Sequence, residues 1–434
     1  MSEAALRSAL SERADTAGPL KIALLGYRSN PYSGGQGIYL RYLSQALVDA
    51  GHQVDVISGE PYPELTDERI KLIKLPGLNL FAEENHLTAL RPRHLASFAD
   101  TFEWYSMATG GFPEPYTFGR RVAAYLARHG HEYDVVHDNQ CLSWGTLSIQ
   151  SSTTPLVTTI HHPITWDRDI ALAHAPNLKH RLLIKRWHLF LRMQTRVARR
   201  LQHIVTVSQR SKQDICRAFN IDPERIQVIY NGIDTETFRP EPSIARNPWQ
   251  LITTASADQP LKGTQHLIPA FATLVERFPK LRLVFIGRPK PGGETEKLIE
   301  RAGVADKIRF VHGIGADEIR HLYASSAIAV VPSEYEGFGL PAGEAMASCV
   351  PLVSTDGGAL PEVVGKAGKV VPAADSAALA TAIAELLDMD PGAREQIGQA
   401  GRQHILESFS WEAAARSMTN TYDRVISEHK AGRA

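Results

Sequence analysis

Two glutamates in the C-terminal half of the chain flank a glycine-containing segment that could bind an anionic ligand. Glu336 and Glu344 lie eight positions apart, and Gly337, Phe338 and Gly339 directly follow the first of them. An apolar run precedes these glycines and a helix-compatible stretch follows, so their backbone N–H groups are expected at a helix N-terminus, where the helix dipole favours negative charge. Glutamates at this spacing usually form an exposed helix face, and the embedded glycines favour a binding site.

Lys262 occupies a position suited to neutralising a phosphate. It follows a predicted strand and precedes a predicted helix (GTQHLIPAFATL). Its ammonium could therefore stabilise negative charge on a departing group. The alternative is an ordinary surface lysine, and the position between strand and helix favours the binding role.

Residues 33–37 (SGGQG) join the first predicted strand to the first predicted helix and contain Gly34, Gly35 and Gly37. Such a loop can bring bare amides and the positive end of a helix against a phosphate. A tight turn that needs glycine only for its dihedral angles gives the same pattern. Both interpretations stay open on the sequence.

His161 ends an apolar run and is followed by His162 and Pro163. An imidazole at the end of a strand could bond a ligand hydroxyl or the reacting centre. It could also merely cap the strand, and His162 is a second candidate. The two adjacent histidines lack the spaced third ligand of a zinc site.

The elements that must position these residues are alternating strands and helices, which predict parallel sheets covered on both faces. A Pro-rich, polar stretch at 239–250 (RPEPSIARNPWQ) indicates an interdomain linker. Strands are expected at 21–27, 53–58, 134–138, 155–161, 203–208, 226–231, 251–256, 281–287, 308–313, 327–333 and 350–355.

The fold class is therefore expected to be α/β, with two doubly wound Rossmann-like domains at 21–239 and 247–408. A final helix at 411–429 is expected to cross back to the first domain. A chain of 434 residues exceeds the size at which one hydrophobic core stops growing, which also favours two domains. Open parallel sheets bind ligands beyond the carboxyl ends of their strands, so two facing domains would form one deep cleft.

The composition is that of a globular enzyme in a reducing compartment. Hydrophobic residues make up 43% and charged residues 22% of the chain. Lys and Arg number 47 and balance 47 Asp and Glu, so no overall attraction to nucleic acid is expected. Cys141, Cys216 and Cys349 have no paired spacing. The first nineteen residues lack the apolar core of a signal peptide, and no later apolar run could span a bilayer, so a cytoplasmic location is expected.

The segment at 332–364 (PSEYEGFGLPAGEAMASCVPLVSTDGGALPEVV) closely resembles the signature of retaining family 4 glycosyltransferases with the GT-B architecture. The resemblance extends over nearly the whole chain, and together its motifs are highly specific. The further motifs that carry it are SGGQG at 33–37, His161, VIYNGIDTETF at 228–238, Lys262 followed by Gly263, and FSWEAAA at 409–415.

The resemblance implies that the second domain binds a nucleotide-diphosphate sugar and that transfer occurs on the face from which the diphosphate departs, with retention. Glu344 would accept hydrogen bonds from the ribose, Glu336 would hold donor-ring hydroxyls, and Lys262 would neutralise the diphosphate. His161, Glu336 and Lys262 are the implied catalytic residues. The implied donor-binding residues are Gly34, Gly35, Gly37, Lys262, Arg288, Glu336, Gly337, Phe338, Gly339, Leu340 and Glu344.

One position departs from the family pattern. Family members commonly carry an arginine five residues before the lysine, and here that position is Ala257. Arg288, at the end of the strand pattern LRLVFIGR, could supply the missing cation. Without a substitute, we expect slower departure of the diphosphate or a donor held differently.

No cofactor or metal is expected to be required. Asp167, Arg168 and Asp169 form a DxD triplet, which in a different glycosyltransferase architecture coordinates a divalent metal. Here the triplet falls in a predicted loop of the first domain, away from the donor motif. We expect it to be solvated or to face the acceptor, and we expect activity to survive a chelator.

The acceptor is expected to meet the first domain. Aromatic residues at 79–117 could stack on a sugar ring or line an apolar acceptor site, although core packing is their commoner use. Residues 179–200 are basic and aromatic with helical periodicity, so they could lie on an anionic membrane or form a core helix with a basic outer face. The residues in the first group are Phe81, His86, Trp104, Tyr105, Phe112 and Tyr116.

Two other functions stay open besides transfer from a UDP- or GDP-sugar to a hydroxyl of a glycan, lipid-linked or small-molecule acceptor. Nucleotide-sugar epimerases share the two-domain architecture, although the donor segment resembles transferases more. A nucleotide-sugar-binding protein with weakened catalysis is the second alternative, and Ala257 motivates it.

Overall fold

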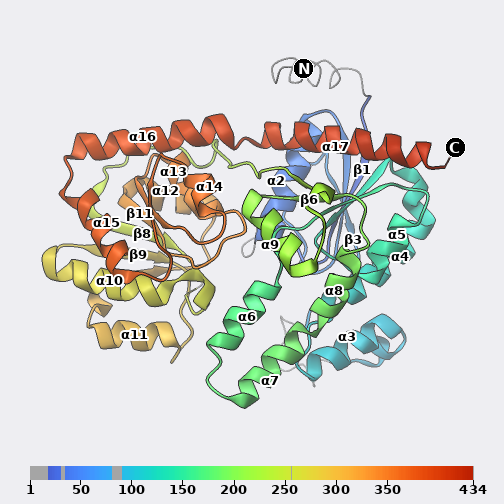
Figure 1. Ribbon diagram of the computed structural model, residues 1–434, viewed down its shortest axis with the longest axis horizontal. Coiled ribbons are helices and arrows are strands. Elements are labelled where there is room, and N and C mark those ends of the chain that lie inside the picture. The colour runs from blue at the N-terminus through green and yellow to red at the C-terminus, as the bar shows by residue number, and fades with distance from the viewer. Residues whose placement is uncertain (1–17, 31–34, 81–89, 256, 434) are drawn as a thin grey trace. The chain divides into compact units, whose positions relative to one another are not determined.

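The chain divides into two compact units. A computed structural model describes residues 18–30, 35–80, 90–255 and 257–433 (Figure 1). The first unit contains the chain up to Val207, then Lys212–Ile229 and Trp411–Ala434, and the second contains Ser208–Ser211 and Tyr230–Ser410. Each unit has its own parallel sheet.

In the first unit the strand order is β3-β2-β1-β4-β5-β6-β7, and every pairing is parallel. The strands are β1 (Lys21–Gly26), β2 (Gln53–Ser58), β3 (Lys71–Lys74), β4 (Val135–Asn139), β5 (Leu156–Thr159), β6 (Ile204–Thr206) and β7 (Ile226–Val228). The α-helices are α2 (Gly35–Asp49), α3 (Phe98–Ala108), α4 (Glu114–His129), α5 (Trp144–Gln150), α6 (Thr165–Ala173), α7 (Leu178–Trp187), α8 (Leu191–Ala198), α9 (Gln209–Phe219) and α17 (Trp411–Ala431).

In the second unit the strand order is β10-β9-β8-β11-β12-β13, again with parallel pairings throughout. The strands are β8 (Asn247–Thr254), β9 (Arg282–Ile286), β10 (Ile308–Val311), β11 (Ser326–Val331), β12 (Leu352–Thr355) and β13 (Lys369–Val371). The α-helices are α10 (Thr264–Arg277), α11 (Glu294–Ala302), α12 (Ala316–Ser325), α13 (Leu340–Ala347), α14 (Leu360–Val364), α15 (Ser376–Asp388) and α16 (Pro391–Ser408).

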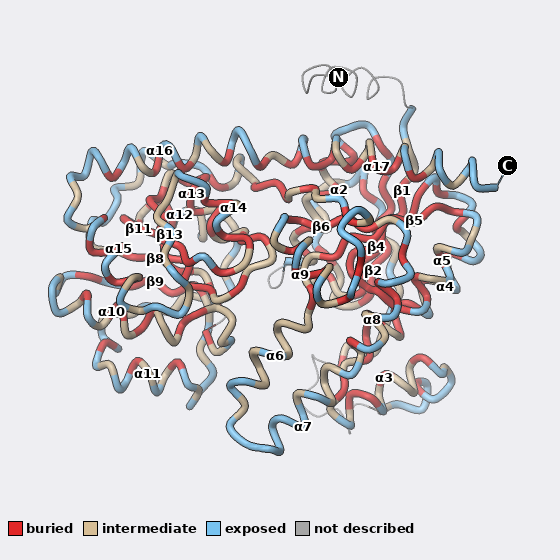
Figure 2. Tube along the Cα trace, in the orientation of Figure 1, coloured by how far each residue is buried: buried red, intermediate tan, exposed pale blue. Residues whose placement is uncertain are grey.

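Both faces of each sheet are covered, as the continuous apolar strands require. In β1, Ala23 and Leu25 pack into a core with α4, α5, α8 and α9. The alternate residues Ile22 and Leu24 pack on the other face, with α2 and α17. In the second unit α10 and α15 cover one face of the sheet. Figure 2 shows most residues of the central strands of both units as buried.

Each strand order reverses direction beside the first strand of its unit, between β1 and β4 and between β8 and β11. At such a switch point the loops from neighbouring strands leave in opposite directions and open a crevice outside the carboxyl ends of the strands. Ligand-binding residues are therefore expected in the loops after these four strands.

Two strands were not predicted from the sequence, and both are edge strands. β3 (KLIK) and β13 (KVV) have half-exposed residues and no continuous apolar run. The predicted linker at 239–250 is also partly wrong, because β8 begins at Asn247 and includes Pro248. The pairing of β8 with β11 is irregular at this end, where Ser326 lies opposite Asn247.

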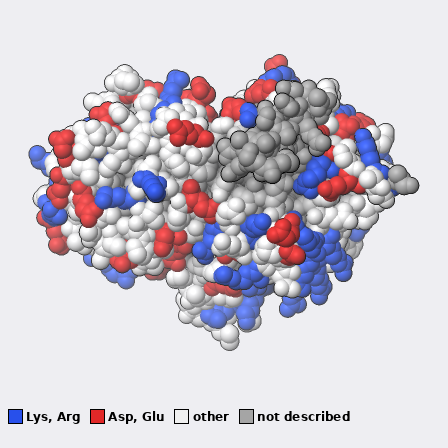
Figure 3. Space-filling view, turned by 45° about the horizontal axis from the view of Figure 1, so that its top comes forward, with Lys and Arg blue, Asp and Glu red and all other residues white. Residues whose placement is uncertain are grey.

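The surface carries both signs of charge, in keeping with 47 basic and 47 acidic residues. Acidic and basic side chains are interspersed over much of the face in Figure 3, with a denser basic group at its lower right. Among the helices of the described ranges, none combines the length and the apolar character needed to cross a membrane.

Candidate functional site

Lys262 and Glu336 meet at the switch point of the second unit. Lys262 lies in the turn between β8 and α10, and Glu336 lies in the loop between β11 and α13. The Nζ atom of Lys262 is 2.8 Å from Oε1 of Glu336, and the Ser333 hydroxyl donates to the same oxygen at 2.8 Å. Both side chains keep some exposure, 23% for Lys262 and 12% for Glu336. A ligand entering from solvent could therefore reach both charges.

Close backbone approach holds the two loops together. Gly263 has φ +68, and a Cβ atom there would lie 1.8 Å from the carbonyl oxygen of Pro332. The Glu334 N–H donates to the Leu261 carbonyl at 2.8 Å, and Gln265 donates to the Glu334 carboxylate at 2.6 Å. Only glycine satisfies both the left-handed backbone and the missing side-chain volume, so Gly263 places Lys262 beside the β11 loop.

A second glycine packs against the backbone of the loop after β11. Gly358, after β12, has φ +66, and a Cβ atom there would lie 2.1 Å from the Glu336 carbonyl oxygen. That oxygen accepts a hydrogen bond from the Ala359 N–H at 2.8 Å. Gly358, in the sequence motif at 332–364, therefore packs directly against the backbone of Glu336 and fixes its position.

The N-terminus of α13 offers free backbone donors. No described residue accepts a hydrogen bond from the N–H groups of Gly337, Phe338, Gly339 or Leu340. The Phe338 side chain is 5% exposed and packs edge-on against Phe409, with 5.7 Å between ring centroids. Unpaired N–H groups at a helix start favour an anion such as a phosphate, so the backbone of this segment, rather than the Phe338 ring, is suited to binding.

Glu344 is a half-buried carboxylate on α13 to which no described side chain or N–H donates. Burial, and after it the negative charge of Asp234, raise its pKa to about 7. A buried carboxylate without a donor partner is costly unless a ligand supplies one. Ribose hydroxyls are donors of this kind, so the geometry suits the role that the sequence predicted.

No hydrogen bond or ion pair joins Arg288 to the other predicted residues within the described ranges. Arg288 follows Gly287 at the end of β9, its side chain is exposed, and no described residue pairs with it. In the strand order β9 lies on the side of β8 away from β11. Ala257 is 3% exposed, so the position of the missing arginine is filled by core. Substitution of Arg288 for the absent cation stays a prediction.

In the first unit His161 lies at the equivalent edge, after β5 and next to the residues that follow β4. Its Nε2 atom is 2.6 Å from Oδ1 of Asn139, and its backbone N–H donates to Oε1 of Gln140 at 2.6 Å. The Tyr39 ring stands edge-on to it at 4.7 Å. Burial, followed by the charges of His162 and His137, lowers the pKa of His161 to about 3. The imidazole is therefore neutral at physiological pH.

Of the described glycines at 33–37, close packing requires one and not the other. A Cβ atom on Gly37 would lie 2.3 Å from the Asn30 carbonyl oxygen, so close packing of α2 against the chain after β1 requires this glycine. A Cβ atom on Gly35 meets nothing within 4 Å. Gly34 lies outside the described residues. The turn interpretation accounts for Gly37, and phosphate binding by this loop stays a prediction.

The DxD triplet lies within α6 and not in a loop, which corrects the sequence interpretation. The Asp167 carboxylate is 3.1 Å from Nε2 of His162, and Asp169 accepts from the Arg168 guanidinium at 2.8 Å. Burial raises the pKa of Asp167, but the charge and hydrogen bond of His162, together with smaller contributions, leave this pKa below its ordinary value. Within the described ranges, no three His, Cys, Asp or Glu side chains are grouped as a metal site would need.

Several aromatic residues of the predicted acceptor region make packing contacts. Phe112 stacks on Trp187 of α7 with 5.3 Å between ring centroids, and Trp104 packs against Leu80 and Met107. Tyr105 remains 57% exposed. Phe81 and His86 lie outside the described residues. Phe112 thus packs against the C-terminal end of α7, and acceptor binding by the aromatic residues stays a prediction.

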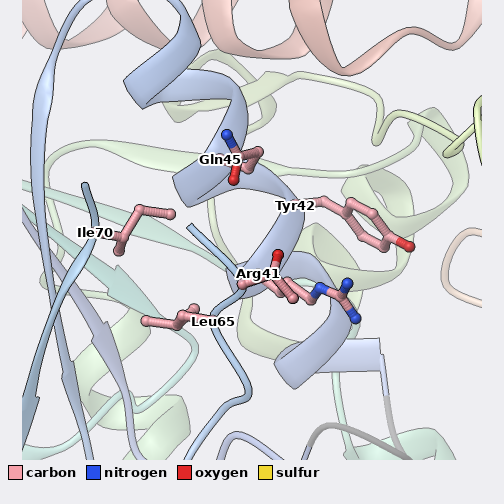
Figure 4. Close-up of a pocket in the computed structure, with 6 residues that line it drawn as sticks. Arg41, Tyr42, Gln45, Leu65 and Ile70 are labelled. Atoms are coloured by element: carbon pink, nitrogen blue, oxygen red, sulfur yellow. The ribbon is translucent and has the colours of Figure 1, made fainter. Parts of the chain in front are cut away.

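A shallow hollow along the middle of α2 is separate from these residues (Figure 4). The side chains that line it come from α2 and from the chain between β2 and β3, and none follows a strand end at a switch point. They are Arg41, Tyr42, Gln45, Leu65, Thr66 and Ile70. We assign this hollow no part in the candidate site.

Asn139, Gln140 and Ser333 were not predicted as site residues, although a signal was present. Each is a polar residue at the end of a switch-point strand or within two residues after it. Polar side chains at these places face ligands in doubly wound sheets. The order of the strands, which reveals the switch points, is not readable from the sequence alone.

Comparison with known proteins gives matches along nearly the whole chain. The family model "Glycosyltransferase Family 4" matches residues 33–237, and "Glycosyl transferases group 1" matches residues 234–404. The MMP alpha-(1->4)-mannosyltransferase of Mycolicibacterium hassiacum is 44% identical over 94% of this chain and 98% of that protein. The D-inositol 3-phosphate glycosyltransferase 2 of Catenulispora acidiphila is 28% identical over 95% of this chain and 97% of that protein.

Solved structures show the same fold at lower identity. Sucrose-phosphate synthase from Thermosynechococcus elongatus superposes with a TM-score of 0.69 at 23% identity, over 94% of this chain and all of that one (100%). Anabaena Alr3699/HepE, solved in complex with UDP-glucose, gives a TM-score of 0.67 at 19% identity, over 93% of this chain and 100% of that one.

Proposed function

Because this chain belongs to the family 4 glycosyltransferases and has the GT-B fold, we propose that it transfers a mannosyl group from a nucleotide-diphosphate mannose to a saccharide hydroxyl. The 44% identity to a protein named an α-(1→4)-mannosyltransferase supports the choice of mannose. The similarity to Alr3699/HepE, whose structure holds UDP-glucose, supports a nucleotide sugar as donor.

The observation that carries the proposal is the arrangement at the switch point between β8 and β11. Lys262, Glu336, the unpaired N–H groups of α13 and the unpaired carboxylate of Glu344 all follow or face the carboxyl ends of these two strands. A cation and bare amides suit a diphosphate, and carboxylates suit sugar and ribose hydroxyls.

In the proposed reaction the bond between the anomeric carbon and the diphosphate oxygen breaks, and its electron pair leaves on that oxygen. The acceptor hydroxyl forms the new bond on the same face, and its proton leaves with the diphosphate. Lys262 and the α13 amides stabilise the charge that develops on the leaving group. The Glu336 carboxylate, which Lys262 and Ser333 already orient, accepts hydrogen bonds from hydroxyls of the sugar. The anomeric configuration is retained because the acceptor attacks the face from which the diphosphate departs.

The test is a panel of GDP-, UDP- and ADP-linked mannose and glucose, each incubated with and without α-mannoside acceptors. Transfer predicts nucleotide diphosphate release that needs an acceptor, together with an α-linked product by NMR. Isomerised donor would show an epimerase instead, and donor binding without turnover would show a protein that has lost catalysis. Lys262→Met is expected to lower kcat by 100-fold or more, on the order of one lost transition-state contact, while Lys297→Met on α11 leaves it unchanged.

We also propose that α7 contacts an anionic membrane surface. Residues 170–213 contain ten Lys and Arg and no Asp or Glu, and no residue of α6 or α7 is buried (Figure 2). Leu178 and Leu182, one helical turn apart, are 71% and 58% exposed. Exposed leucines among cations are typical of helices that lie in a lipid interface.

Vesicle sedimentation tests this contact. The protein is expected to sediment with phosphatidylglycerol vesicles at low salt, to remain in solution with phosphatidylcholine alone, and to be released by high salt. Serine at both Leu178 and Leu182 should abolish binding, whereas Leu406→Ser, at a leucine that is 43% exposed on α16, should not. The proposal would be overturned if the protein sedimented with neither vesicle type. It would also be overturned if the wild-type protein self-associated and the double serine variant did not, because the leucines would then form a contact between protein copies.

A further inference from the structure

Two serine hydroxyls converge on one backbone carbonyl of the loop after β11. The Gly337 carbonyl oxygen accepts from the Ser208 hydroxyl at 2.8 Å and from the Ser211 hydroxyl at 3.0 Å. Both serines are 0% exposed, and both belong to the second unit, as Gly337 does. A carbonyl oxygen has two lone pairs, so these two hydroxyls saturate it. The reaction proposed above uses neither serine.

The start of α9 directs the Ser208 hydrogen toward Gly337. Ser208 is the residue before this helix, and its Oγ atom accepts the Ser211 N–H at 2.9 Å, as the side chain of a helix-capping serine does. Because its oxygen is the acceptor in that contact, the hydroxyl hydrogen of Ser208 is left to donate to the Gly337 carbonyl. The capping contact and the carbonyl contact therefore support each other.

A carboxylate holds the start of α9 independently of these hydroxyls. Glu362 of α14 accepts the Gln209 N–H at 2.8 Å and the Arg210 N–H at 2.7 Å. The same carboxylate accepts from the Tyr230 hydroxyl at 3.1 Å, and its charge interacts favourably with the N-terminal end of the helix dipole. Loss of a serine hydroxyl is therefore expected to leave the backbone at the start of α9 in place.

The peptide unit between Gly337 and Phe338 connects the two hydroxyls to the proposed diphosphate site. This peptide bond is trans, so it is planar and its C=O and N–H point in opposite directions. The Phe338 N–H therefore points away from the serines, and no described residue accepts a hydrogen bond from it. Hydrogen bonds to a carbonyl also polarise the amide, which makes its N–H a stronger donor.

We propose that Ser208 and Ser211 are positioning residues that direct the Phe338 N–H toward a phosphate oxygen of the nucleotide-diphosphate donor. The inference rests on the proposed function, because that donor must occupy the second unit. Negative charge on the diphosphate grows as the bond to the sugar breaks, so an N–H directed at it stabilises the transition state more than the bound donor. Removal of the hydroxyls is therefore expected to lower kcat as well as donor affinity.

The first measurement observes this one peptide unit and needs no activity. In full-length protein labelled with [1-¹³C]glycine and [¹⁵N]phenylalanine, a spectrum that correlates each amide with the preceding carbonyl shows only Gly–Phe pairs. The sequence contains two such pairs, Gly111 with Phe112 and Gly337 with Phe338, and a Phe112→Leu variant assigns them. GDP, UDP and ADP are added in turn. The nucleotide that binds should move the Phe338 amide proton downfield, as a hydrogen bond to a phosphate oxygen does.

Ser208→Gly combined with Ser211→Ala, called the hydroxyl-free variant, removes both donors without adding bulk or charge. Glycine caps a helix nearly as well as serine. In the free variant the Gly337 carbonyl signal should move upfield, because its oxygen loses both donors. The Phe338 proton should then shift less when the nucleotide binds, and affinity measured by calorimetry should fall by up to about tenfold, as for one lost hydrogen bond.

Ser326→Ala is the matched control. Ser326 is also 0% exposed, its hydroxyl also donates to a backbone carbonyl, that of Leu322 at 2.7 Å, and it begins β11 at the end opposite the loop. This variant loses a buried hydroxyl of the same unit. It should nevertheless retain the wild-type affinity and both Gly–Phe signals.

The second measurement compares transfer kinetics with binding. The hydroxyl-free variant should lose more in kcat/KM for the donor than in donor affinity, because the N–H acts most strongly in the transition state. The positioning role would be refuted, while transfer stands, if the bound nucleotide did not move the Phe338 proton or moved it equally in the wild-type protein and the hydroxyl-free variant. If the wild-type protein bound none of the three nucleotides, the proposed function would fail and the inference with it.

Discussion

Replacement of Glu344 by glutamine should remove a pH dependence from donor binding. The pKa of Glu344 is raised from 4.5 to about 7, and a carboxylate accepts ribose hydroxyls more strongly than a protonated acid. Only about a tenth of the side chain is ionised one pH unit below the pKa, so donor affinity in the wild-type protein should weaken by up to about tenfold between pH 8 and pH 6. Glu344→Gln should bind more weakly by about 1.5–3 kcal/mol at pH 8, and its affinity should not vary with pH.

The assay is isothermal titration calorimetry with the intact nucleotide sugar in the absence of acceptor. The diphosphate of this ligand is esterified at both ends and does not titrate near neutral pH, so a change in affinity reports on the protein. Glu294→Gln, at an exposed position on α11, serves as the control and should retain wild-type behaviour. Equal affinity of the wild-type protein at pH 6 and pH 8 would refute the reasoning.

The same substitution has a consequence for stability with a defined sign. A folded-state pKa above the unfolded value means that ionising Glu344 opposes folding, so its cost begins near pH 4.5 and is complete above pH 7. The full cost is about 3 kcal/mol. The difference in unfolding free energy between Glu344→Gln and the wild-type protein should therefore grow in favour of the variant as pH rises from 5 to 8.

Three further outcomes are expected. Gly263→Ala should lower the free energy of unfolding by about 2–4 kcal/mol through strain and overpacking, whereas Gly292→Ala, at a similar φ of +67 but in open space, should cost only about 1 kcal/mol in urea unfolding. Gly37→Ala should lower the melting temperature and Gly35→Ala should not, because only the former meets backbone within 4 Å; equal effects would contradict the packing explanation. Transfer activity should survive EDTA, and loss of activity that magnesium or manganese restores would contradict metal-independent transfer.

The sequence predicted most of the fold because its strands are buried on both faces and form apolar runs. β2 was located to the residue at 53–58, whereas the edge strands β3 and β13, exposed along one side, carry no such signal. The predicted linker ended too late because β8 extends through Pro248 into polar residues. Local composition does not reveal that a neighbouring strand will pair with such a segment.

For the candidate site, the sequence located the segments but not their contacts. Lys262 and Glu336 were predicted separately, and their 2.8 Å ion pair depends on two loops that glycine allows to touch. Arg288 follows β9, which lies directly beside β8, and its proposed contact with the donor stays a prediction. Asn139 escaped notice because its role depends on the pairing of β4 with β5, which brings it beside His161.

The place of α17 bears on the order in which this protein can fold. Trp411, Met418, Tyr422 and Val425 of this helix complete the core that also contains Ile22 of β1, and the Tyr422 hydroxyl is 2.6 Å from His137. Domains usually fold as the ribosome delivers them, from the N-terminal end. Until the last helix has been synthesised, α2 is the helix that covers this face of β1, so nascent chains expose the part of the face that α17 covers later for almost the whole of translation.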